Sequence, residues 1–234
     1  MQFALFSDHQ PLVYGFSTRS DGSMNRFTCV PNRHRYFTRR GLDPERVVTA
    51  DLVHGTEVSQ VSAALGGTIA PHTDALVTNA TDTYLSVTGA DCFPLFFCDP
   101  IHHAVGIAHA GWRGAVGNIV ANTVAAMQRE YGTMPSDLLC GIGPGIRRCH
   151  FSIKPEDAGR YDTYTPYLVE RNGQWFADLP GIIREQLIAA GLTTEHIEDS
   201  EVCTYCNAQD YFSYRRDRPD ELELMVGHFG ITSK

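Results

Sequence analysis

The sequence predicts an α/β fold of the mixed α+β kind, in which a single domain covers residues 1–234. Short apolar runs bounded by turn residues recur along the chain and are typical of strands. Only two stretches show the strong 3.6-residue apolar periodicity of an amphipathic helix. Because the strand patterns outnumber the helical ones and only partly alternate with them, we expect a mixed sheet. No internal repeat, low-complexity tract or linker divides the chain.

The first third of the chain contains strand patterns and one short basic helix. Apolar runs interrupted by turn residues predict strands at residues 3–6, 12–18, 47–53, 58–61 and 74–78. The run 33–40 is rich in arginine and ends at Gly41, which predicts a helix with a charged face turned to solvent.

The middle of the chain holds three apolar runs, two of which are followed by chemically reactive residues. Residues 84–87, 94–97 and 104–108 read as buried strands. Asp91 and Cys92 follow the first of these runs, and His109 follows the third. A glycine-flanked turn at residues 111–114 then opens a helix, whose free backbone N–H groups favour an anion.

The last half of the chain contains the two clear helices. One begins near Ala115 and stops before Gly132, and the other runs from Leu179 to Gly191. Further strands are predicted at residues 138–142, 211–215 and 222–226.

Composition limits the possible functions. The hydrophobic fraction of 43% and the charged fraction of 20% are ordinary for a globular protein. The net charge of -8 argues against general binding to nucleic acid or to an anionic membrane, and no apolar run approaches the ~20 residues of a membrane span. The first residues lack the features of a signal peptide, so we expect a cytoplasmic protein whose seven cysteines are free thiols.

Three residues at the ends of apolar runs form the candidate site. His54, Cys92 and His109 each lie beside small residues, which leave room for a ligand. Two imidazoles and one thiolate would make a three-ligand zinc site with an open fourth position, the arrangement of catalytic zinc. The spacing alone is a weak signal, because ten histidines and seven cysteines offer many such triples.

Several motifs, in order and across nearly the whole chain, closely resemble the YfiH/laccase-domain family. They are V-H-G (53–55), T-D-A-L-V-T (73–78), A-D-C-F-P (90–94), H-A-G-W-R-G (109–114), G-I-G-P-G-I (141–146), C-T (203–204) and F-S-Y-R-R (212–216). The resemblance implies a single YfiH/laccase-type domain with layered sheets and helices. It also implies that His54, Cys92 and His109 bind the metal, with Zn²⁺ expected ahead of copper.

The resemblance also implies a function. Family members are described as purine nucleoside phosphorylases with adenosine deaminase activity, as polyphenol oxidases, and as a peptidoglycan editing factor. We therefore expect a zinc-dependent purine nucleoside phosphorylase that acts on adenosine, inosine, guanosine or methylthioadenosine with phosphate. Adenosine deaminase activity is a further expectation, and Cys92 and His109 are expected to be catalytic.

Phosphorolysis requires groups that bind a phosphate dianion. Arg19, Arg113 and Arg215 are candidates, because a guanidinium grips phosphate with two N–H groups. Asp91 is a candidate general acid or base, with a capping carboxylate as the alternative. Asp74 is a candidate substrate-binding residue and has the same alternative.

Other functions use the same residues. Cys92 and His109 alone would suit a Cys-His hydrolase or amidase, for example one that edits peptidoglycan precursors. A copper-dependent polyphenol oxidase would need closely spaced histidines, and no His-x-His occurs. A structural metal in a binding module would need a fourth ligand, for which His72 is the candidate. Residues Cys203 to Cys206 form a C-x-x-C that lacks a second pair and is interpreted as packing.

Overall fold

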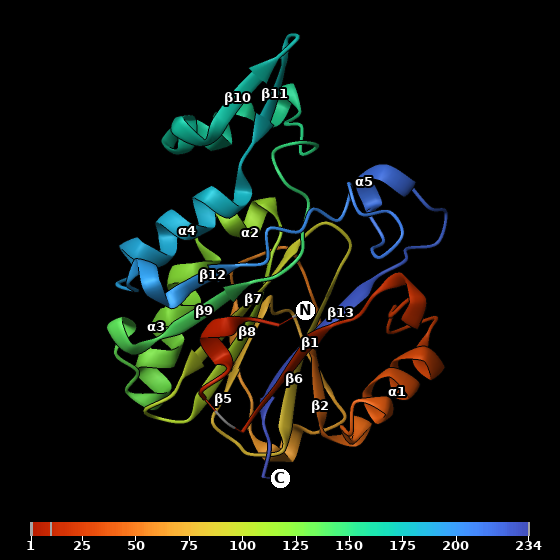
Figure 1. The fold of residues 1–234 in the computed structure, drawn as a ribbon, viewed down its shortest axis with the longest axis vertical. Helices are drawn as coiled ribbons and strands as arrows, with labels where there is room; N and C mark the ends of the chain where they lie inside the picture. The colour runs from red at the N-terminus through yellow and green to blue at the C-terminus, as the bar shows by residue number, and fades with distance from the viewer. Residues whose placement is uncertain (1, 10, 234) are drawn as a thin grey trace.

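The computed structural model describes residues 2–9 and 11–233, and its strands form two large sheets (Figure 1). The five-stranded sheet has the order β1 (Leu12–Phe16), β13 (Met225–Ile231), β6 (Thr83–Gly89), β2 (Val47–Ala50) and β4 (Ile69–Ala70). The six-stranded sheet has the order β12 (Ile197–Asp199), β9 (Leu139–Ile142), β7 (Phe93–Asp99), β8 (Ala104–Ala110), β5 (Ala75–Thr78) and β3 (Val58–Gln60). Both sheets mix parallel and antiparallel pairs, as the sequence predicts.

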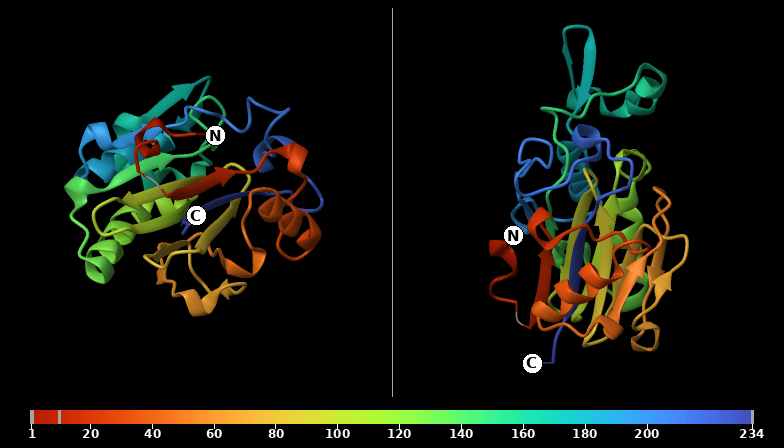
Figure 2. Two further views of the ribbon diagram at one scale, coloured as in Figure 1. Left: turned by 60° about the horizontal axis from the view of Figure 1, so that its bottom comes forward. Right: turned by 90° about the vertical axis from the view of Figure 1, so that its right-hand side faces the viewer.

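The helices and one separate hairpin complete the architecture. The helices are α1 (Val30–Arg39), α2 (Trp112–Val116), α3 (Ile119–Tyr131), α4 (Leu179–Ala189) and α5 (Tyr214–Asp217). The hairpin joins β10 (Leu168–Arg171) to β11 (Gln174–Ala177) and projects from the top of the molecule in two of the views (Figures 1 and 2). No described helix combines the length and the apolar character that crossing a membrane requires.

The two sheets face each other and share a core. Side chains alternate along each strand, so neighbours in sequence point to opposite faces of the sheet. Phe96 of β7 and Ile107 of β8 therefore point between the sheets, where they join Leu85 of β6 and Phe229 of β13 in one buried cluster. Burying each of these large side chains contributes roughly 1.5–3 kcal/mol to stability.

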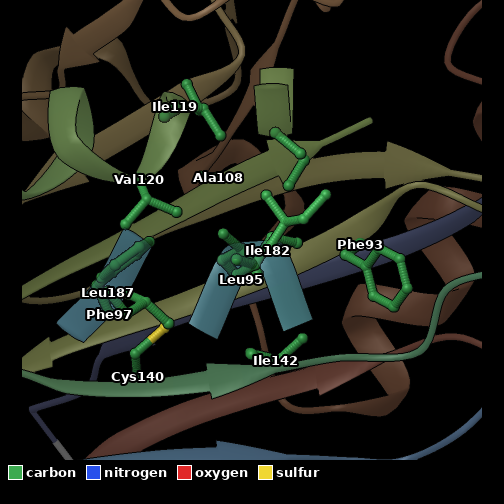
Figure 3. Packing of buried hydrophobic residues seen from close by; sticks show 14 of the residues in the cluster. Phe93, Leu95, Phe97, Ala108, Ile119, Val120, Cys140, Ile142, Ile182 and Leu187 are labelled. Carbon is green, nitrogen blue, oxygen red and sulfur yellow. The ribbon is translucent and has the colours of Figure 1, made fainter. Parts of the chain in front are cut away.

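The other face of the six-stranded sheet is covered by helices α2, α3 and α4 (Figure 3). Leu95 and Phe97, one residue out of phase with Phe96, pack there against Ile182 and Leu187 of α4. The result is a layered sandwich of sheets and helices, which confirms the predicted fold class.

Helix α1 covers the outer face of the five-stranded sheet, and its predicted solvent-facing character is only partly right. Arg33 is buried, and its charged group is satisfied there: the guanidinium donates to the carbonyl oxygen of Met24 at 3.1 Å and to Oγ1 of Thr49 at 2.7 Å. Tyr36 and Phe37 are also buried in the cluster beneath this helix. The arginine-rich run therefore forms an amphipathic helix with one buried face.

Three of the predicted elements differ in the structure. Residues 3–6 are not a strand, because a short 3-10 helix covers Ala4–Phe6 and the Ser7 hydroxyl donates to the carbonyl oxygen of Ala4. The predicted strand 211–215 is wrong, since the Ser213 hydroxyl caps helix α5 there. The predicted strand 222–226 is displaced, because β13 begins only at Met225.

The helix predicted from residue 115 is interrupted. Helix α2 ends at Val116, and α3 begins after Asn118, which adopts the left-handed conformation with a φ of 69°. The side chain of Asn118 accepts the backbone N–H of Ala121 and so caps the second helix. Strands β6, β7 and β8 confirm the three central predictions and extend each of them.

Candidate metal centre

The structure brings His54, Cys92 and His109 together. His109 is near the end of β8, Cys92 immediately precedes β7, and His54 lies in the loop between β2 and β3. Their ligand atoms all lie within 4.8 Å of one another, and the two imidazole rings meet edge to face with centroids 4.9 Å apart. His109 is buried and His54 is exposed, so the cluster opens to the surface on one side.

Asp74 holds two of the three candidate ligands in place from behind. Its side chain is fully buried, and Oδ1 lies 2.9 Å from Nδ1 of His109. The same carboxylate accepts the backbone N–H groups of Val53, His54 and Gly55 at 3.2, 3.0 and 2.7 Å. Because Nδ1 of His109 is taken by Asp74, Nε2 is the nitrogen that remains for a metal.

The electrostatics of Asp74 agree with this arrangement. Burial raises the pKa of the Asp74 carboxyl, but the hydrogen bonds from His109 and Gly55 outweigh burial and hold the pKa below its usual range. The carboxylate therefore stays ionised at neutral pH and keeps the His109 ring in one orientation.

Gly111 leaves the space in which the three ligands meet. A Cβ atom added there would lie 2.9 Å from Sγ of Cys92, 3.3 Å from Cδ2 of His54 and 3.6 Å from Cε1 of His109. The first of these separations is shorter than real Cβ contacts, so a side chain at this position would displace the sulfur. The backbone of H-A-G-W-R-G therefore has glycine where the ligands converge.

Without a metal, Cys92 and His109 form an ion pair. Burial raises the pKa of the Cys92 thiol, but the facing imidazoles of His109 and His54 more than offset burial and lower the pKa to about 6. Burial lowers the pKa of His109, but Cys92 and Asp74 raise it to about 9. At neutral pH the sulfur is a thiolate, the form that binds metals.

The backbone around the cluster is strained. His54 has a φ of 58° and Asp91, which precedes Cys92, has a φ of 93°. Such values are uncommon for residues other than glycine and cluster at functional sites. At Asp91 the strain is stabilised by two hydrogen bonds, from the Thr204 hydroxyl to Oδ1 and from the Arg215 backbone N–H to Oδ2, each 2.7 Å long.

The residues present fit a zinc ion. Two imidazole nitrogens and one thiolate are donors that zinc prefers, and three protein ligands leave a position for substrate. A carboxylate bonded to the far nitrogen of a ligating histidine is the usual support of such a ligand. His72, the candidate fourth ligand, is not part of the cluster of His54, Cys92 and His109.

The predicted arginines occupy two places. Arg113 and Arg215 both lie close enough to Tyr161 to act on its hydroxyl electrostatically. Arg113 also stacks over the Trp112 ring at 4.4 Å. Arg19 instead pairs with Asp217 at 2.6 Å, so its charge is already partnered.

A second cluster was missed from the sequence. Cys203 and Cys206, interpreted above as packing, lie with Cys149 and His150 in a group whose ligand atoms are all within 4.8 Å of one another. The signal that could have found it is the adjacent pair Cys149-His150, which is the second half that the C-x-x-C seemed to lack. All seven cysteines are free in the structure, as predicted.

The fold and the site together define the class of the protein, a two-sheet α/β sandwich with a His/Cys/His centre at its surface. The chain belongs to the family described as multi-copper polyphenol oxidoreductase laccase, whose model matches residues 21–227. This family membership confirms the resemblance found in the sequence.

Named relatives are consistent with the family. The chain is 35% identical over 210 residues to the purine nucleoside phosphorylase YlmD of Geobacillus stearothermophilus, covering 83% of this chain and 76% of that protein. It is 32% identical over 245 residues to the protein of the same name from Bacillus subtilis, covering 93% and 88%.

Solved structures agree with the fold. The crystal structure of YlmD from Geobacillus stearothermophilus matches with a TM-score of 0.90 at 30% identity, covering 97% of this chain and 94% of that one. The structure of the hypothetical protein YfiH from Bacillus licheniformis matches with a TM-score of 0.88 at 27% identity, covering 94% and 92%.

Proposed function

We propose that this chain is a zinc-dependent purine nucleoside phosphorylase. The observation that carries the proposal is the open three-ligand cluster of His54, Cys92 and His109 in a chain whose relatives are named purine nucleoside phosphorylases. Phosphorolysis breaks the N-glycosidic bond of the nucleoside and joins phosphate to the anomeric carbon of the ribose. The site must therefore hold an anion and stabilise the departing base.

The metal and its ligands have separate roles in this proposal. A zinc ion bound at the cluster would supply Lewis acidity that polarises a substrate oxygen or nitrogen. Cys92, His54 and Nε2 of His109 would hold the ion, and Asp74 would orient His109 and the loop that carries His54. We accordingly assign Asp74 a positioning role in place of substrate binding, because its oxygens are occupied by protein donors.

Arg113 and Arg215 are the proposed phosphate-binding residues. They share the neighbourhood of Tyr161, whereas Arg19 is neutralised by Asp217. The backbone N–H of Arg215 is bonded to Asp91, so this arginine is linked to the residue before Cys92. Asp91 thereby links the backbone of this arginine to Cys92, the candidate ligand that follows Asp91, and we assign Asp91 a positioning role in place of acid or base catalysis.

The donor set favours zinc over a multi-copper centre. A multi-copper oxidase needs several closely spaced histidines. Within residues 2–9 and 11–233, the two groups of potential metal ligands hold two histidines in one and a single histidine in the other. Neither group matches a cluster of coppers.

Cys92→Ala tests the proposal. We expect this variant to lose both bound zinc and the phosphate-dependent cleavage of inosine and adenosine. Ammonia release from adenosine, measured in the same assay, tests deamination at C6. Cys29→Ala, which changes a cysteine at the start of α1, is the matched control and should keep both metal and activity. Full turnover by metal-free Cys92→Ala protein would contradict the proposal.

A second candidate function has one observation in its favour. Cys92, His109 and Asp74 lie in the order of a nucleophile, its base and an orienting carboxylate, with the thiol pKa lowered to about 6. Such a trio would suit a Cys-His amidase that acts on peptidoglycan precursors. A variant of His54 distinguishes the two proposals, because His54 belongs to the metal cluster but not to this trio. His54→Ala should abolish phosphorolysis, while a thiol amidase would keep most of its activity.

A further inference from the structure

The second cluster is built from two loops that the fold brings together. Cys149 and His150 follow β9, and Cys203 and Cys206 follow β12, the strand that pairs with β9 in parallel. An isolated bridge between Gly145 and Cys203 continues that pairing beyond the strands. The loops therefore meet because both leave the same edge of the six-stranded sheet.

The separations within this cluster are those of ligands around one small ion. Sγ of Cys149 lies 3.4 Å from Sγ of Cys203 and 3.6 Å from Sγ of Cys206, and Sγ of Cys206 lies 3.3 Å from Nδ1 of His150. Tetrahedral zinc with ordinary bond lengths places two sulfurs about 3.8 Å apart, and a sulfur and a nitrogen about 3.5 Å apart. The observed distances are within a few tenths of an ångström of these values.

We propose that Cys149, His150, Cys203 and Cys206 bind a structural zinc ion as a closed Cys3His site. Three sulfurs and one imidazole complete the four-coordinate shell that structural zinc prefers, so no position remains for substrate. This site is distinct from the cluster of His54, Cys92 and His109, because the two clusters share no residue.

The ring of His150 is already oriented for this role. It stacks on the Tyr205 ring with centroids 3.9 Å apart and an angle of 13° between the planes. Tyr205 lies inside the C-x-x-C, so the same short turn supplies two sulfurs and fixes the imidazole. A ligand whose orientation is fixed before binding loses less entropy when the metal arrives.

The proposed ion would fix the loop that supports Asp91. The Thr204 hydroxyl, between the two cysteines of the turn, donates to Asp91 at 2.7 Å. The carbonyl oxygens of Thr204 and Tyr205 accept the Arg216 guanidinium, each at 2.8 Å. Metal in the closed site would therefore stabilise Asp91, the residue that directly precedes Cys92 of the open site.

A disulfide is the chemical rival of the metal. Oxidation of two of the three thiols would form one S–S bond, release two electrons and two protons to an oxidant, and leave one cysteine unpaired. It would give no role to His150. Zinc, in contrast, uses all four side chains.

Zinc content separates the two sites. For protein purified under reducing conditions we expect about two zinc ions per chain in the wild type and about one in Cys206→Ser. Cys92→Ser should also hold about one, at the other site, and Cys29→Ser should hold two as the matched control. Cys206→Ser that retains the wild-type zinc content would overturn the closed site, whatever happens to Cys92→Ser.

Thiol protection tests the same site in the unaltered chain. Zinc-loaded wild type treated with iodoacetamide should leave Cys149, Cys203 and Cys206 unmodified, as mapped by peptide mass spectrometry, while Cys29 reacts. After a chelator removes the metal, the two exposed thiols Cys149 and Cys206 should be alkylated. Unchanged modification of these two cysteines with and without zinc, or a disulfide between any two of the three, would refute the proposal.

Discussion

The two Cys/His clusters of this molecule differ in their number of potential metal ligands and in the residues that surround them. The cluster of His54, Cys92 and His109 offers three potential metal ligands, with a buried carboxylate behind it and an exposed imidazole at its mouth. The cluster of Cys149, His150, Cys203 and Cys206 offers four potential metal ligands on two loops, and two of these ligands are exposed cysteines. Three ligands leave a metal free to bind substrate, and four do not.

The comparison teaches where each kind of site is built. The open cluster takes its residues from three separate parts of the chain: the loop after β2, the residue before β7 and the end of β8. The four-ligand cluster needs only two short local pairs on neighbouring loops. The open cluster is thus anchored to a buried strand through His109, whereas all four residues of the other cluster lie in loops.

The largest expected effect concerns the carboxylate that only the open cluster has. Asp74→Asn replaces an acceptor of four N–H groups with an amide whose nitrogen would face donors. Loss of such a partner typically costs about 10–100-fold in metal affinity or activity. We expect the zinc affinity of the open site and the phosphorolysis rate to fall in that range, measured by competition with a chelator and by inosine turnover.

Asp99 provides a matched control for Asp74. It is also a buried carboxylate, and it accepts the backbone N–H groups of Ile101 and His102 and contacts Nδ1 of His102, each at 2.9 Å. It lies at the opposite end of β7 from Cys92. Asp99→Asn should reduce thermal stability as Asp74→Asn does but leave zinc affinity unchanged. Equal loss of zinc in both variants would show that Asp74 acts only through stability.

A smaller effect is expected from filling the space where the three ligands meet. Gly111→Ala adds a methyl group 2.9 Å from Sγ of Cys92, and its φ of -72° imposes no backbone penalty on alanine. We expect about tenfold weaker zinc binding at the open site, because displacing a ligand lowers the metal affinity as the loss of a supporting hydrogen bond does. Zinc binding at the closed cluster should be unaffected.

Gly159→Ala is the control for Gly111→Ala, since nothing lies within 4 Å of a Cβ added at Gly159. Both variants should fold, as measured by circular dichroism. Zinc affinity in Gly111→Ala equal to that of Gly159→Ala would mean that the ligands do not meet as closely as the structure shows.

The smallest effect is the pH dependence of Cys92 in the metal-free protein. Its pKa is lowered to about 6, so the thiolate is present above that pH and is lost as the pH falls through it. The alkylation rate of Cys92, followed by mass spectrometry, should be nearly constant from pH 8 to 7 and should fall about tenfold per pH unit below about 6. In His109→Ala the fall should begin at a higher pH. A wild-type midpoint near the ordinary thiol pKa of about 8.5 would contradict the ion pair.

The sequence was most informative where patterns are local. The apolar runs of β6, β7 and β8 and the helix α4 were predicted because burial imposes a period that the residues display. The break at Asn118 and the helix α5 were missed, since each depends on one capping side chain. One of these errors touches the site, because α5 carries Arg215, whose backbone N–H donates to Asp91.

The site was predicted through the motifs of the family, and its supports were not. Nothing in the local sequence shows that Asp74 is buried behind His109 or that Thr204 reaches Asp91, because these contacts join residues 35 and 113 positions apart. The four-ligand cluster was missed for the same reason, since Cys149 and Cys203 meet only through the parallel pairing of β9 and β12.

The most direct test of the central claim is inosine turnover with phosphate in protein stripped of metal by a chelator and then resupplied with zinc. The account predicts that turnover disappears on stripping and returns with zinc in the wild type, and that in Cys92→Ala it does not return. Undiminished phosphorolysis by the stripped wild type would contradict the claim that His54, Cys92 and His109 hold the metal on which the reaction depends.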